Sequence, residues 1–100
     1  MSKRVILTID NVRIKEYDRM NLTVERYEDV FIPKDKRTVK KWVFKGYVSS
    51  VLRGLLLIQE KEMLIDKENI DSLQDYINKV EWSNEKLVSA ASEVQKWEIL

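Results

Sequence analysis

The chain contains no cysteine and no histidine. These absences remove disulfides, thiolate nucleophiles, the Ser-His and Cys-His catalytic pairs and the usual zinc ligands. Only Asp, Glu, Lys, Tyr and Ser remain as catalytic side chains, and no motif gathers them. We therefore expect a protein that is not an enzyme and that has no cofactor and no metal ion.

Glycine and long apolar runs are also scarce. The two glycines are Gly46 and Gly54, so a glycine-rich phosphate loop is excluded. The longest purely apolar run, 55–58, is far too short to span a membrane, and the N-terminus lacks the apolar region of a signal peptide. Together with the lack of cysteine, this predicts a cytoplasmic protein with no membrane partner.

The formal net charge of +1 conceals a division between the two halves of the chain. Residues 1–54 carry thirteen Lys and Arg against seven Asp and Glu, whereas residues 55–100 carry five against ten. A basic half is suited to phosphates or to an acidic protein. The interpretation that we favour is that the two halves pack together and pair their charges.

Alternating apolar residues predict strands in the first half and helices in the second. We expect one α+β domain, 1–100, built from an antiparallel sheet of three to four strands in 1–48, a buried helix in 49–64 and a long helix in 66–98. The order is β-β-β-α-α. Ser49 or Ser50 is suited to cap the first helix and Asp66 the second.

Residues 33–36 form the turn of the last hairpin. We expect even positions of the strands 21–32 and 38–47 to share one face. The connection between the two strands must then have an odd number of residues, because a slip by one residue would place Trp42 and Phe44 in water. We expect these two rings in the core.

A heptad pattern runs through the long helix. Its a and d positions are Ile70, Leu73, Ile77, Val80, Asn84, Leu87, Ala91 and Val94. Two interpretations stay open: an oligomer seam along Asn84, Leu87, Ala91 and Val94, or an internal seam with a helix break near Ser83. Trp82 and Trp97 lie off the seam and are either anchors for a partner or cover for the domain's own sheet.

Basic and aromatic residues are interleaved in the last hairpin. The candidate binding residues are Lys34, Lys36, Arg37, Lys40, Lys41, Trp42 and Lys45, with Phe44 and Tyr47 as further interleaved rings. Cations beside aromatic rings are typical of single-strand nucleic-acid binding. The alternative, which we favour, is a solvated hairpin whose lysines protect its edge.

The segment Trp42-Val43-Phe44-Lys45-Gly46-Tyr47, followed by a leucine-rich helix and a long charged helix, resembles small uncharacterised proteins of phages, prophages and other mobile elements of Gram-positive bacteria. The resemblance covers most of the chain and implies a non-enzymatic accessory protein. Our first hypothesis is a phage-type inhibitor or modulator of a larger host or defence protein, acting as a monomer or a homodimer. The alternative is a nucleic-acid-binding accessory protein of phage replication or recombination, which uses the basic hairpin.

Overall fold

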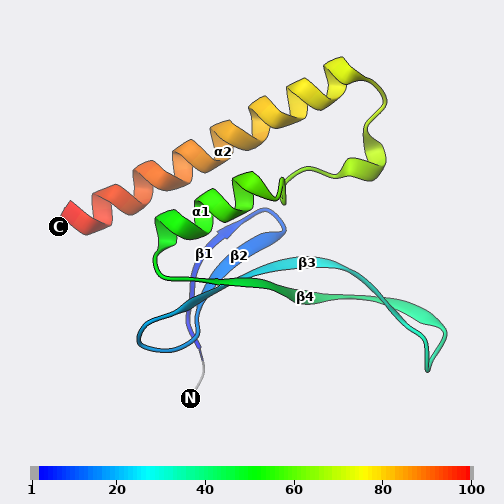
Figure 1. The fold of residues 1–100 in the computed structure, drawn as a ribbon, viewed down its shortest axis with the longest axis horizontal. Coiled ribbons are helices and arrows are strands. Elements are labelled where there is room, and N and C mark those ends of the chain that lie inside the picture. Colours follow the sequence, from blue (N-terminus) through cyan, green and yellow to red (C-terminus); the bar gives the residue numbers. More distant parts are fainter. Residues whose placement is uncertain (1–2, 100) are drawn as a thin grey trace.

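The computed structural model describes the backbone of residues 3–99 and the side chains of residues 3–94. It contains one antiparallel sheet with the strand order β1-β2-β3-β4 and two helices on one side of it (Figure 1). The expected α+β class is confirmed, with a fourth strand. The elements are β1 (Val5–Ile9), β2 (Val12–Glu16), β3 (Leu22–Ile32), β4 (Arg37–Val48), α1 (Val51–Glu60), a 3-10 turn (Lys67–Asn69) and α2 (Leu73–Ile99).

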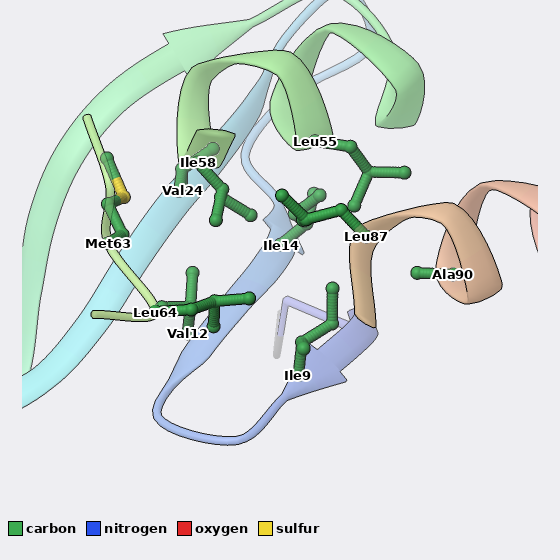
Figure 2. Packing of buried hydrophobic residues seen from close by; sticks show 10 residues of the cluster. All are labelled: Ile9, Val12, Ile14, Val24, Leu55, Ile58, Met63, Leu64, Leu87 and Ala90. Atoms are coloured by element: carbon green, nitrogen blue, oxygen red, sulfur yellow. The ribbon is translucent and has the colours of Figure 1, made fainter. Parts of the chain in front are cut away.

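The core lies between the sheet and the helices. Val12, Ile14 and Val24 occupy alternate positions of β2 and β3, so their side chains point to the same side of the sheet, where α1 packs on them. α2 runs along α1 in the opposite direction (Figure 1). Figure 2 shows the buried cluster, which consists of Ile9, Val12, Ile14, Val24, Leu55, Ile58, Met63, Leu64, Leu87 and Ala90.

α1 begins where the sequence indicates and ends earlier. The Ser50 hydroxyl accepts a hydrogen bond from the Arg53 N–H at 3.2 Å and caps the helix. The helix ends at Glu60, and Glu62 adopts a left-handed conformation with φ of 52° that turns the chain away. Met63 and Leu64 therefore enter the core from an irregular connection rather than from the helix.

α2 begins later than expected. Asp66 caps the 3-10 turn, where its carboxylate accepts from the Glu68 N–H at 3.1 Å, and does not cap the long helix. The Ser72 hydroxyl instead accepts from the Asp75 N–H at 3.1 Å, one residue before α2 begins. The helix is continuous through Ser83, which is only 3% exposed, so no break occurs there.

The C-terminal half of the heptad seam is internal. Leu87 and Val94 are only 7% and 2% exposed in the single chain, so both are buried within the domain itself. Ala91 is half-buried against the core, and the Asn84 side chain accepts a hydrogen bond from Gln59 of α1 at 3.2 Å. The prediction of an oligomer seam at these positions is therefore wrong for Leu87 and Val94, because both side chains are already buried and cannot contact another chain.

Of the two tryptophans off the seam, Trp82 has its side chain within the described residues. Trp82 is 41% exposed on α2, with the Lys86 ammonium 5.4 Å from its ring centroid. The side chain of Trp97 lies outside the described residues. Neither helix in the described part of the chain is long and apolar enough to cross a membrane.

Candidate nucleic-acid interface

The turn between β3 and β4 decides which side of the sheet the hairpin aromatics occupy. Ile32 pairs with Arg37, so the turn has four residues, 33–36, and even positions of β3 oppose odd positions of β4. Trp42 and Phe44 consequently lie on the side away from the helices. The prediction that these rings lie in the core is wrong: Phe44 is 50% exposed and Trp42 is half-buried.

A β-bulge at Lys45 returns the end of β4 to the core. Val24 pairs with Gly46 while the next residue of β3, Glu25, pairs with Phe44, so Lys45 is the extra residue. Beyond the bulge, Gly46 meets α1 closely, because a Cβ there would be 3.2 Å from the Leu57 Cδ2. The bulge thus lets β4 present aromatic rings on one side and pack against α1 on the other.

Six aromatic side chains gather on the helix-free side of the sheet. We call this set the aromatic face; its members are Tyr17, Tyr27, Phe31, Trp42, Phe44 and Tyr47. Five of them are at least 39% exposed. Their ring centroids are 4.9 Å apart in the pair Tyr17 and Tyr47, 4.7 Å in Phe44 and Tyr47, and 5.2 Å in Tyr27 and Trp42.

The aromatic face follows the length of β3. Thr23 opposes Tyr47 and lies eight residues from Phe31. At about 3.4 Å per residue, the rings cover a track of about 27 Å. The outer part of this track lies on the two-stranded ribbon that β3 and β4 form beyond the core (Figure 1). The protein's radius of gyration of 15.2 Å exceeds the value of about 13 Å for a compact chain of this length, in keeping with this extension.

Cationic side chains lie among the rings. The Arg13 guanidinium carbon is 4.0 Å from the Trp42 ring centroid, and its Nε is 2.6 Å from a Glu25 carboxylate oxygen. Lys15, the next residue on the same side of β2, forms no ion pair within residues 3–94. Lys40 lies 3.9 Å from Asp29, a separation at which its charge remains available to other anions.

The loop that holds Tyr17 is organised by Asp18. Its carboxylate accepts from the backbone N–H groups of Met20 and Asn21 at 2.9 and 2.8 Å. These bonds, first the one from Met20 and then those from Asn21, lower the pKa of Asp18, so the carboxylate keeps its acceptor form in mildly acidic solution. Hydrogen bonding to Tyr17 raises the pKa of the Tyr47 hydroxyl.

The cations predicted from the sequence are divided between the two sides of the hairpin. Lys34 and Lys36 lie in the turn, and Arg37 is 3.6 Å from Asp35. Of the seven predicted residues, Lys40 and Trp42 belong to the aromatic side. Lys41 and Lys45 lie on the other side of the ribbon.

The Lys45 ammonium is bonded to a Glu28 carboxylate oxygen at 2.8 Å. This contact, followed by the one with Arg26, lowers the pKa of Glu28. The predicted basic cluster is therefore not one continuous surface.

Sequence reasoning missed half of the aromatic face, namely Tyr17, Tyr27 and Phe31. It also left out the two cations that β2 places beside the rings, Arg13 and Lys15. The sequence of β3 did contain a signal for the face. Tyr27 and Phe31 stand at odd positions, so they lie on the side of the strand away from its apolar even positions. A four-residue turn carries this odd face onto the even positions of β4.

A further surface gives no indication of a ligand. An open groove of about 760 Å³ lies between the ribbon and the connection after α1, but cations such as Lys45, Lys61 and Lys67 alternate there with Glu28 and Glu62. Within the described residues, no group of three or more acidic side chains is arranged to hold a metal ion.

Comparison of the chain with protein-family models, with curated proteins and with solved structures found no match. The function of this protein is therefore inferred from the geometry of the aromatic face.

Proposed function

We propose that the protein binds single-stranded nucleic acid through the aromatic face. The observation that carries the proposal is the row of exposed rings, with Arg13, Lys15 and Lys40 among them, on the side of the sheet opposite to both helices. Bases stack on aromatic side chains, and Lys and Arg attract the phosphates between them. Neither interaction requires a particular base, so we expect binding that tolerates many sequences.

The geometry favours single strands over a duplex. In a duplex the faces of the bases are already stacked on one another, so the rings could reach only unpaired bases. A track of about 27 Å on a sheet surface suits an extended strand. Exposed apolar rings gathered on one face of a small protein also favour a binding surface over an incidental exposure.

Fluorescence anisotropy with labelled oligothymidine tests the proposal directly. Phe44→Ala and Tyr47→Ala should each weaken binding about 5-fold to 150-fold, since one base stack is worth about 1–3 kcal/mol. Trp82→Ala is the matched control, because this ring is 41% exposed but lies on α2. Its affinity should equal that of the wild type. If all three variants bind alike, the aromatic face is not the site.

Salt dependence tests the contribution of the cations. The logarithm of the binding constant should fall steeply with the logarithm of the salt concentration, with a slope of about −0.7 per phosphate contact for single strands. Lys15→Ala should reduce the steepness by about 0.7. An affinity that does not change with salt, or an absence of binding at low salt, contradicts the proposal.

We further propose an accessory, non-enzymatic role in the bacterial cytoplasm, in replication or recombination of a phage or mobile element. This step rests on the resemblance to small phage and prophage proteins and on the binding surface. Accessory proteins of this kind protect or present single strands to enzymes, for which a sequence-tolerant stacking surface is sufficient.

A larger host or defence protein is the second candidate partner. Trp82 favours it, because a tryptophan exposed on a helix and separate from the aromatic face is a typical anchor of protein interfaces. Capture of partners from a Gram-positive lysate, with and without nuclease, separates the candidates. A stoichiometric protein that survives nuclease and is lost with Trp82→Ala supports modulation, whereas recovery that disappears with nuclease supports nucleic acid.

A further inference from the structure

The outer side of α1 carries an exposed stripe of mixed chemistry. Arg53, Leu56 and Glu60 are spaced by three and four residues, so their side chains lie along one side of the helix, and all three are exposed. Leu56 is 57% exposed. The helix buries Gly54, Leu55 and Ile58 instead, which places the stripe away from the core.

This stripe is complementary to itself. When two copies of α1 pack in opposite directions about a two-fold axis at Leu56, Arg53 of each copy lies beside Glu60 of the other, and the two leucines meet between the pairs. A two-fold interface requires such a surface, on which residue i contacts residue j and residue j contacts residue i. Within residues 3–94, neither Arg53 nor Glu60 has an ion-pair partner in its own chain.

We propose that the protein forms a homodimer through the outer side of its helices, with α1 packed antiparallel to α1 of the second copy. α1 has ten residues and is therefore about 15 Å long. A stable interface covers about 800 Å² on each partner, which is more than one short helix supplies. We assign the remaining contact to α2, where Val88 is 65% exposed beside the half-buried Ala91.

This interface differs from the heptad seam that the sequence indicates. Leu87 and Val94 stay inside each subunit, and the contact uses the stripe that the heptad pattern leaves out. Because both helix layers lie at the centre of the dimer, the two aromatic faces point outward and stay accessible. The dimer therefore does not depend on the proposed nucleic-acid binding.

A charge-exchange experiment tests the pairing. Light scattering after size exclusion should give about 24 kDa for the wild type, twice the chain mass of 12.0 kDa. Arg53→Glu and Glu60→Arg each place like charges opposite one another and should give monomers. The double variant R53E/E60R restores opposite charges and should restore the dimer. Arg37→Glu, the same change at the far end of the ribbon, should remain dimeric.

Three outcomes would overturn the dimer. They are a wild type that stays monomeric at the highest soluble concentration, single variants that remain dimeric, and a double variant that fails to recover. Circular dichroism spectra equal to that of the wild type will show that the single variants are folded. Oligothymidine affinity measured on the monomeric variants keeps the two proposals separate: it should persist there, and its absence from every form would contradict the proposed function alone.

Discussion

Gly54 lies inside α1, where glycine normally lowers helix stability by about 1 kcal/mol relative to alanine. On an exposed helix, Gly→Ala would therefore stabilise the protein. Here a Cβ would come 2.7 Å from the Ile14 Cδ1, and Ile14 is only 1% exposed. Overpacking of a buried site costs about 1–3 kcal/mol, so we expect Gly54→Ala to lower the free energy of unfolding by up to about 2 kcal/mol.

A double-mutant cycle isolates this contact. Ile14→Val removes the Cδ1 methyl, and alone it should cost about 0.5–1.5 kcal/mol. After its removal, the nearest of the remaining contacts, Ile14 Cγ1 and Val48 Cγ2, lie 3.4 Å from the new Cβ, within ordinary van der Waals range. Gly54→Ala should then stabilise the Ile14→Val variant by about 1 kcal/mol through helix propensity.

The assay is urea unfolding of the four proteins, with free energies from the midpoint and slope. The effect of Gly54→Ala should change sign between the two backgrounds, with a coupling free energy of about 1–3 kcal/mol. Additive effects, or a wild-type background that gains about 1 kcal/mol from the alanine, would refute the reasoning that close approach to Ile14 selects glycine.

Further predictions concern the helix cap, the ribbon and the core. Ser50→Ala should cost about 1 kcal/mol in urea unfolding, because it removes the cap of α1, whereas the neighbouring Ser49→Ala should have little effect. The pKa of Glu28 in the folded protein is lowered from 4.5, chiefly by Lys45. The ion pair therefore stabilises the folded state fully above pH 4.5, and this stabilisation is lost as the pH falls through the lowered pKa. The stability difference between wild type and Glu28→Gln should therefore be at most about 1 kcal/mol at neutral pH and should shrink below pH 4.5; a constant difference would contradict the assignment. Ile58→Ala should cost about 2–5 kcal/mol, since the side chain is 1% exposed.

The sequence predicted the existence of the strands and helices better than it predicted where they end and what they pack against. Alternation and helical periodicity identified the sheet and both helices, and Ser50 was identified as one of two candidate caps. The early end of α1 was missed because residues 61–64 continue an apolar pattern while Glu62 adopts a left-handed conformation. The pattern reports which side chains become buried and does not report whether a helix carries them.

The candidate site was predicted in part. Basic and aromatic interleaving raised nucleic acid as the alternative to a solvated hairpin, yet two of the predicted cations, Lys41 and Lys45, lie away from the aromatic face. Arg13, Lys15 and Tyr17 come from β2 and the loop after it, so a pattern within the last hairpin cannot contain them; strand pairing and ring contacts bring them to the face. Tyr27 and Phe31 do lie in this hairpin, and they were missed because the turn was expected to have an odd number of residues.

By itself, the sequence determined that these 100 residues carry no thiol and no imidazole side chain, and which segments form strands and helices, because side-chain types and periodicity are local properties. Only the tertiary structure decided where two sets of apolar side chains point. A four-residue turn places Trp42 and Phe44 on the open side of the sheet, and the bulge at Lys45 places Tyr47 on that same side, since each extra residue in a strand reverses its faces. Packing against α1 and the sheet, in turn, places Leu87 and Val94 inside the domain, because an apolar stripe is equally suited to an internal and an external neighbour.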